Sequence, residues 1–158
     1  MNQHQRFREV QDLAYRSAVR SAEREGKNTI TAFCAKLGLT PAQADLVSYL
    51  ERGEMTLADL ARCVRARPSA LGRPMSALTA SGMVELLGSS GPTNLGPVRY
   101  RLTARGKAVV ETLGESLPTI HARASEASRA AFARQYARAL EGYDRSGVLG
   151  APHPRELN

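Results

Sequence analysis

The stretch TLADLARCVRARPSALGRPMSALTASG, residues 56–82, decides the fold that we expect for this chain. Thr56 is a suitable N-cap for a short helix. Apolar residues recur on one face of that helix: Leu57, Leu60, Ala61 and Val64. Pro68 disfavours helical backbone at the residue before it, so the chain should turn there. The first half of the stretch therefore predicts a short helix followed by a turn.

A second amphipathic helix is expected after that turn, from about Ser69 to Ser81 and Gly82. Its inward positions follow the spacing i, i+4, i+7 and are Leu71, Met75 and Leu78. Two short helices joined by a tight turn, the second flanked by arginines, predict a helix-turn-helix.

The residues that follow predict a β-hairpin. Residues 83–87 favour a strand, and residues 88–97 have the composition of a turn. In residues 98–102 apolar and cationic residues alternate, which is the pattern of a half-buried strand with Arg99 and Arg101 facing solvent. A hairpin directly after the second helix would be the wing of a winged helix.

Helices are also expected before this domain. Residues 1–37 have helical periodicity, but Gly26-Lys27-Asn28 weakens it, so this segment is one bent helix or two. A further helix should start at Thr40, because Pro41 suits its first position and Gln43 can complete a capping box.

After the wing, Thr103 should begin a helix that Ser116-Leu117-Pro118 breaks, and an alanine-rich helix should continue to about Asp144. This last helix carries an apolar stripe that consists of Phe132, Tyr136, Leu140 and Tyr143. We expect the stripe to pair with a second copy of the chain, because the small winged domain is already covered by its own helices. Packing onto residues 1–37 of the same chain is the alternative.

The fold class expected is therefore mainly α: a winged helix-turn-helix with a two-stranded wing, flanked by N- and C-terminal dimerisation helices. Residues 1–37 and 107–145 would form the dimerisation region and residues 38–106 the DNA-binding domain. Residues 146–158 would be a tail.

The charge distribution favours a nucleic-acid partner. Of 22 basic residues 19 are arginine, whose planar donor group fits phosphates and guanine edges. The formal charge is +2 over residues 1–53, +5 over residues 54–107 and zero over residues 108–158. The excess thus coincides with the expected winged helix.

Other classes of protein find no support in the sequence. No apolar run approaches the ~18 residues of a membrane span, and the polar N-terminus is not a signal peptide, so we expect a cytoplasmic protein. Two cysteines and three scattered histidines do not make a metal site. No phosphate loop, nucleophile elbow or catalytic triad is present, so we expect neither an enzyme nor a cofactor.

Several short motifs resemble the MarR (multiple antibiotic resistance regulator) family of winged-helix transcription factors. They are Leu37-Gly38-Leu39-Thr40-Pro41-Ala42-Gln43, Leu57-Ala58-Asp59-Leu60-Ala61, Leu78-Thr79-Ala80-Ser81-Gly82-Met83-Val84 and Leu102-Thr103-Ala104-Arg105-Gly106. The resemblance implies a dimer that places its recognition helices in successive major grooves of double-stranded DNA. It also implies regulation, in many members, by a small phenolic or oxidative signal.

The chain departs from this family at three points. The Asp-x-Arg of the family's wing tip is replaced by Asn94-Leu95-Gly96. Gly72 and Pro74 fall inside the recognition helix, and the family's N-terminal peroxide-sensing cysteine has no counterpart, since Cys34 lies too near the second helix.

The candidate DNA-binding residues are Arg65, Arg67, Ser69, Arg73, Ser76, Arg99 and Arg101. Arg73 matches the position at which the family carries a DNA-contacting arginine, and the arginines beside the turn and on the wing suit phosphates. Ser69 could instead cap the helix, and the wing arginines could instead protect an edge strand. Cys63 is a candidate redox thiol.

These features predict a homodimeric, sequence-specific DNA-binding regulator, a repressor that binds a palindromic operator and responds to a small-molecule effector. The alternative is a winged-helix module that has lost specific DNA binding and docks another protein.

Overall fold

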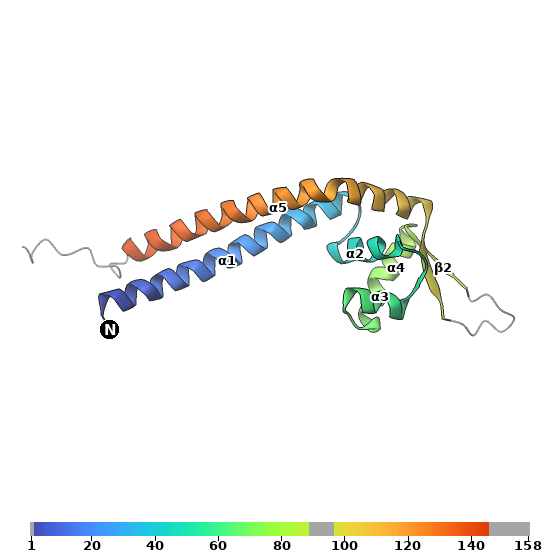
Figure 1. Ribbon diagram of the computed structural model, residues 1–158, viewed down its shortest axis with the longest axis horizontal. Coiled ribbons are helices and arrows are strands. Elements are labelled where there is room, and N and C mark those ends of the chain that lie inside the picture. Colours follow the sequence, from blue (N-terminus) through green and yellow to red (C-terminus); the bar gives the residue numbers. More distant parts are fainter. Residues whose placement is uncertain (1, 89–96, 146–158) are drawn as a thin grey trace, which may run out of the picture. The chain divides into compact units, whose positions relative to one another are not determined.

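The computed structural model describes residues 2–88 and 97–145 and consists mainly of helices with a small antiparallel sheet (Figure 1). In chain order the elements are α1 (Gln3–Lys36), α2 (Pro41–Leu50), β1 (Met55–Thr56), α3 (Leu57–Val64), the 3₁₀ turn η1 (Pro68–Ala70), α4 (Gly72–Ala80), β2 (Val84–Leu87), β3 (Arg99–Leu102) and α5 (Ala104–Arg145). This is the winged helix-turn-helix with terminal helices that the sequence predicts. The wing tip Asn94-Leu95-Gly96 and the expected tail 146–158 lie outside the described residues.

The chain divides into two compact units. The helical unit contains residues 1–30 and 121–158, and the winged unit contains residues 31–120. Both boundaries lie inside long helices, α1 and α5. The functional division at residues 37 and 107 stays a prediction.

In the helical unit, α1 and the second part of α5 run side by side in opposite directions (Figure 1). Every fourth residue of α1 on the contact face is small or β-branched: Val10, Ala14, Ala18, Ala22 and Gly26. The hydroxyl of Ser128 donates to the carbonyl oxygen of Ala22 at 2.9 Å. A Cβ atom on Gly26 would lie 2.6 Å from that hydroxyl oxygen, so glycine permits the close approach. Of the two alternatives for residues 1–37, a single helix is therefore the one observed.

The break expected at residues 116–118 is wrong, because α5 continues through Pro118. Proline removes one backbone donor from a helix and costs about 3 kcal/mol. Leu113 and Ile120, on either side of it, are both buried and seven residues apart, which is two helical turns. Burial on the same face before and after Pro118 therefore holds the helix together.

The winged unit contains three antiparallel strands in the order β1-β3-β2. The sequence predicts only the two-stranded wing formed by β2 and β3, in which Glu85 lies opposite Arg101. The additional strand β1 has two residues, too few for alternation to be recognised, and pairs Thr56 with Arg99. Because β3 is the central strand, the interpretation of Arg99 and Arg101 as edge-strand protection is wrong.

Two capping boxes fix the starts of α2 and α3. The backbone N–H of Gln43 donates to Thr40 Oγ1 at 3.2 Å, and Gln43 Oε1 accepts from the Thr40 N–H at 2.9 Å. Thr56 and Asp59 make the equivalent pair of bonds, each 3.2 Å long. Both helix starts are thus where the sequence predicts them. The largest fully buried side chains among the described residues all belong to the winged unit: Leu46, Val47, Leu60, Met75, Leu78, Met83 and Val84.

Candidate nucleic-acid interface

The turn of the helix-turn-helix begins at Arg65, which caps the C-terminus of α3 in the left-handed conformation with φ 55° and ψ 42°. Arg65 is the one described residue other than glycine with a positive φ. Its geometry allows the N–H of Ala66 to donate to the carbonyl oxygen of Ala61 at 2.9 Å. Left-handed backbone costs an L-residue about 1–2 kcal/mol, so a glycine would be the conformationally easier choice here. Arg65 and Arg67 are both exposed.

The second helix, α4, starts later than the sequence predicts. Residues 68–70 form the 3₁₀ turn η1, and α4 begins at Gly72 with Leu71 as an N-cap that makes no side-chain capping bond. The N-cap role considered for Ser69 is therefore wrong, because Ser69 lies inside η1 and is exposed. The late start also explains Pro74, which becomes the third helical residue. Backbone N–H groups in the first turn have no partner within a helix, so proline removes nothing there.

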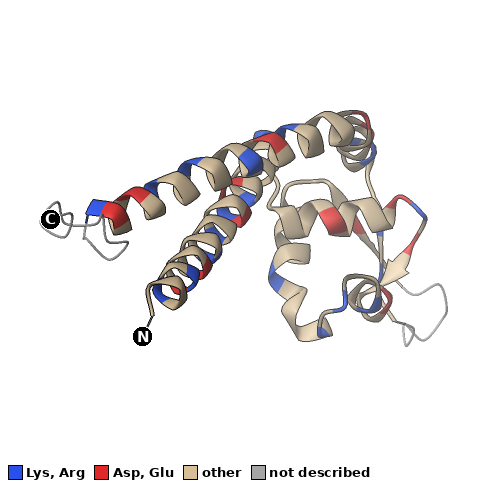
Figure 2. Ribbon diagram, turned by 60° about the vertical axis from the view of Figure 1, so that its left-hand side comes forward, with Lys and Arg blue, Asp and Glu red and all other residues tan. Residues whose placement is uncertain are grey.

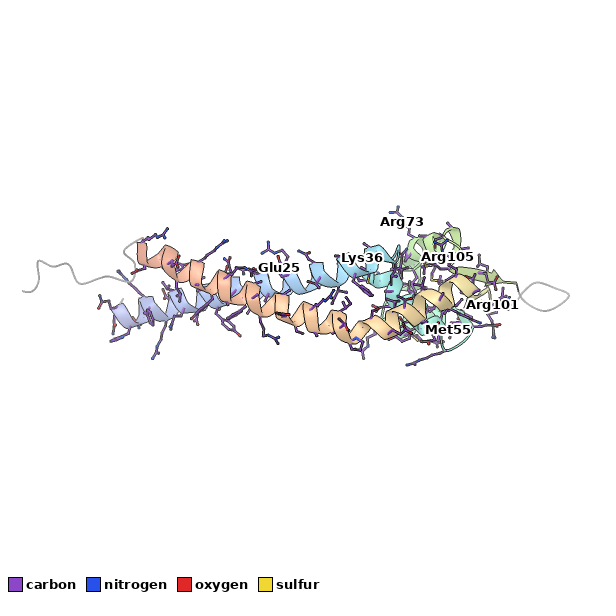
Figure 3. The ribbon with its side chains drawn as sticks, turned by 90° about the horizontal axis from the view of Figure 1, so that it is seen from above. Glu25, Lys36, Met55, Arg73, Arg101 and Arg105 are labelled. Carbon is purple, nitrogen blue, oxygen red and sulfur yellow. The ribbon has the colours of Figure 1, made fainter. Side chains whose placement is uncertain are left out.

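Three side chains that point into the core fix the rotation of α4 about its own axis. Leu71, Met75 and Leu78 have exposed fractions of 5%, 1% and 0%. Arg73 and Ser76 lie on the opposite, exposed face. The Arg73 side chain extends away from the ribbon in Figure 3.

Thr103 and Gly106, which follow the wing, connect the wing to the end of α4. The backbone N–H of Thr103 donates to the carbonyl oxygen of Met83 at 3.0 Å, and its hydroxyl donates to the carbonyl oxygen of Gly82. A Cβ atom on Gly106 would lie 2.1 Å from the same Met83 oxygen. Only glycine allows the first turn of α5 to approach this closely, so the wing and α4 keep a fixed relation.

The two wing arginines differ in their surroundings. Both are exposed, as the alternation predicts. Arg101 forms an ion pair with Glu85 on the neighbouring strand. Arg99 has no ion-pair partner within residues 2–88 and 97–145, so its guanidinium is the one available for a phosphate.

The segment that forms the turn and α4 carries basic charges only. Residues 60–84 contain Arg62, Arg65, Arg67 and Arg73 and no carboxylate (Figure 2). Arg62 is paired with Asp59, whose pKa is lowered by hydrogen bonds from Thr56 and by Arg62. The other three arginines make no ion pair with any described residue.

Neither cysteine is part of a disulfide. Cys34 is buried, and this burial raises the pKa of its thiol, with a smaller contribution from the charge of Asp45. A raised pKa disfavours the reactive thiolate. Cys63 is half-buried in the last turn of α3, and its redox role stays a prediction. No three potential metal ligands lie together in the described part of the chain.

The stripe expected on the last helix is half-buried within the helical unit. The ring of Phe132 contacts Tyr15 of α1 edge-on, with centroids 5.6 Å apart, and stacks on Tyr136 at 5.8 Å. Gln135 donates to the hydroxyl of Ser17 at 2.9 Å. Part of the stripe thus packs against the same chain. Large apolar side chains remain exposed on α1, with fractions of 44% for Phe7, 51% for Leu13 and 56% for Tyr15.

The winged unit also contains a cavity of about 540 Å³. Leu50, Leu102 and Val110 form its apolar wall. The charged groups around it are Glu51, Glu54, Arg101, Lys107 and Glu111. Because Arg101 belongs to β3, this cavity adjoins the wing.

Sequence reasoning missed two features of the interface. The first is the ion pair between Glu85 and Arg101. It follows from the register of the hairpin, which places the two residues opposite each other, but the sequence does not reveal the length of the turn that sets this register. Ala77 and Ala80 share the exposed face of α4 with Arg73, and counting helical turns from buried Met75 would have found them.

The arrangement of α3, η1, α4 and the β2–β3 wing defines the class: a winged helix-turn-helix with the fold of the MarR-family regulators. No model of a protein family matches the sequence, and neither does any curated protein. The reduced form of MarR from E. coli is a solved structure with this fold, with a TM-score of 0.59 and 20% sequence identity over 68% of this chain and 79% of that one.

Two further solved structures have the same fold. A cysteine-to-serine mutant of MarR from E. coli, complexed with operator DNA, has a TM-score of 0.58 and 19% identity over 68% of this chain and 77% of that one. Bordetella bronchiseptica BpsR, whose DNA binding is regulated by 6-hydroxynicotinic acid, has a TM-score of 0.56 and 20% identity over 75% of this chain and 87% of that one. At these identities the likeness establishes the fold. None of the described helices combines the length and the hydrophobicity needed to cross a membrane.

Proposed function

We propose that this chain is a DNA-binding transcriptional regulator, and not an enzyme, that acts as a homodimeric repressor at a palindromic operator. Each α4 would enter a major groove, and each wing would contact the flanking backbone or minor groove. Arg65, Arg67 and Arg99 would bind phosphates, and Arg73 would contact a base edge.

One observation carries the proposal. The exposed surface from the end of α3 to the end of α4 has no carboxylate, and its arginines Arg65, Arg67 and Arg73 form no ion pair with any described residue. A solvated surface serving only solubility normally mixes both signs of charge. A one-signed surface on a helix-turn-helix favours the phosphate backbone of DNA. The solved complex of mutant MarR with operator DNA shows that this fold can bind DNA in that protein.

The dimer is supported by the helical unit. Two helices alone leave Phe7 and Tyr15 about half exposed on α1. A second copy would add two helices and complete a four-helix arrangement, in which Phe132 and Tyr136 would extend the shared apolar layer. Twofold dimers are the commonest assembly, and such an axis imposes a palindrome on the DNA. Sedimentation of the full chain at micromolar concentration tests this, and a monomer would refute it.

The function is tested by selecting bound fragments from a random pool of double-stranded DNA. We expect an inverted repeat with half-sites roughly 34–36 Å apart. Affinity for the selected fragment should fall steeply as salt rises, because phosphate contacts release counterions. Recovery of no common sequence, together with weak binding at low salt, would refute the proposal.

One argument for the alternative of a protein-docking module is the position of Pro74 within the recognition helix. Pro74 lies in the first turn of α4 and does not distort the helix, so the exposed face of α4 keeps regular geometry. An apolar protein interface would be nearly independent of salt, which distinguishes it from DNA binding in the same titration.

A small-molecule effector forms part of the proposal. The cavity beside the wing is within the range of about 300–1,000 Å³ that is common for ligand sites. Since Arg101 lines it, a bound molecule would act directly on the wing. A compound that dissociates the DNA should do so less effectively with the variant Glu111→Ala, which removes an exposed charged group from the wall of the cavity.

A further inference from the structure

The exposed face of α4 carries mostly short side chains, and these side chains limit which bases the helix can recognise. Four residues occupy this face: Arg73, Ser76, Ala77 and Ala80. Arg73 is the one long side chain among them. Gly72, at the start of the helix, adds no side chain, and a Cβ atom there would meet nothing within 4 Å.

The orientation of these residues is set by the core and not by their own contacts. Met75 and Leu78 are almost completely buried, so α4 cannot rotate about its axis without exposing them. The hydroxyl of Thr79 donates to the carbonyl oxygen of Met75 at 2.9 Å, which satisfies the polar group at the edge of the face. Arg73 and Ala77, four residues apart, therefore lie one above the other on the same exposed strip.

We propose that the Arg73–Ala77 strip of α4 reads a guanine together with a thymine methyl group in each half-site. This rests on the proposed function. Arginine forms two parallel hydrogen bonds with guanine O6 and N7, and alanine makes apolar contact with the thymine C5-methyl group. Short Ala77 and Ala80 side chains let the helix approach the floor of the groove, where a longer residue would hold it away.

The geometry also gives the spacing of the two bases. Four helical residues span about 6 Å along the axis. Stacked base pairs are separated by about 3.4 Å along each strand. Because α4 would lie inclined to the DNA axis in the groove, the guanine and the thymine methyl group should lie one or two base pairs apart in each half-site.

The test uses the DNA fragment selected by the full-length protein from a random pool. Replacing the relevant thymidine by deoxyuridine removes only the methyl group. Burying one such group contributes about 0.8 kcal/mol, which corresponds to about fourfold in affinity for one half-site and about fifteenfold for both. Replacing the guanine by 7-deazaguanine removes the N7 acceptor and should weaken binding of the wild-type protein, with little effect on Arg73→Ala.

The protein variant Ala77→Gly completes a double-mutant cycle. It should bind the thymidine fragment about fourfold more weakly per half-site and should no longer distinguish thymidine from deoxyuridine. Ala108→Gly, at an exposed alanine in α5, has the same cost in helix propensity and should retain full discrimination.

The outcomes separate this inference from the function on which it rests. If specific DNA is selected but deoxyuridine has no effect at any thymine, or if Ala77→Gly discriminates as well as the wild-type protein, the inference is overturned and the regulator remains. If no specific DNA is selected, the proposed function fails and the inference falls with it.

Discussion

Arg65→Gly should make the protein more stable and, at the same time, a weaker DNA binder. Arg65 has φ 55° and ψ 42°, a conformation that costs an L-residue about 1–2 kcal/mol and glycine almost nothing. Glycine loses about 0.5–1 kcal/mol more backbone entropy on folding. The net change in the free energy of unfolding should be a gain of about 0.5–1 kcal/mol. In a chain of 158 residues this corresponds to a rise of about 1–4 °C in Tm.

DNA affinity should change in the opposite direction. Each lost phosphate contact lowers the slope of log affinity against log salt by about 0.9, so a dimer that loses two contacts should show a slope smaller by about 1.8. Circular dichroism during heating gives the first quantity. Fluorescence anisotropy of the selected DNA fragment over a series of salt concentrations gives the second.

Arg65→Ala is the matched control, because alanine lacks the guanidinium but keeps the unfavourable backbone. It should lower the salt slope as much as glycine does, without the gain in Tm. An equal fall in Tm for both variants would refute the reasoning about backbone strain. An unchanged slope in both would remove Arg65 from the DNA interface.

Three other predictions test separate parts of the molecule. Arg73→Ala should cost about 1–3 kcal/mol on the selected fragment and relax specificity at one position per half-site, and equal loss on every DNA sequence would reveal a phosphate contact instead. Arg99→Ala should lower the salt slope by about 0.9 per subunit, whereas Arg101→Ala should lower it less because Glu85 already neutralises that side chain; the reverse order in the same titration would contradict the assignment. Gly106→Ala should reduce the free energy of unfolding by about 1–3 kcal/mol, despite the higher helix propensity of alanine, because the new Cβ atom would clash. The control is Gly114→Ala, whose new Cβ atom would have nothing within 4 Å; it should raise the free energy of unfolding by up to about 1 kcal/mol. Urea unfolding measures both changes.

Local sequence chemistry predicts the starts of α2 and α3 and the position of the wing after the helix-turn-helix. Thr40 and Thr56 cap their helices because each needs only a partner three residues away, Gln43 and Asp59. The wing alternation is equally local, and it gives the exposure of Arg99 correctly.

The errors concern residues whose environment is made by distant parts of the chain. Pro118 is held in a helix by buried residues on either side of it, and Gly26 leaves room for the hydroxyl of Ser128, about a hundred positions away in the sequence. The pairing of Glu85 with Arg101 depends on a hairpin register that composition does not specify. The candidate DNA-contacting arginines could be predicted from the sequence as exposed cations. Only the fold shows which of these arginines are already neutralised by an ion pair with a carboxylate.

The boundary between the two compact units has a mechanical consequence. The units are joined by two continuous helices and by no loop, since residues 30 and 31 lie within α1 and residues 120 and 121 within α5. A proline lacks one backbone hydrogen bond and makes a helix easier to bend where it occurs, and Pro118 lies two residues from the boundary. In the proposed dimer, the range of operator spacings that the protein tolerates would therefore depend on the bending stiffness of the helical turn around Pro118.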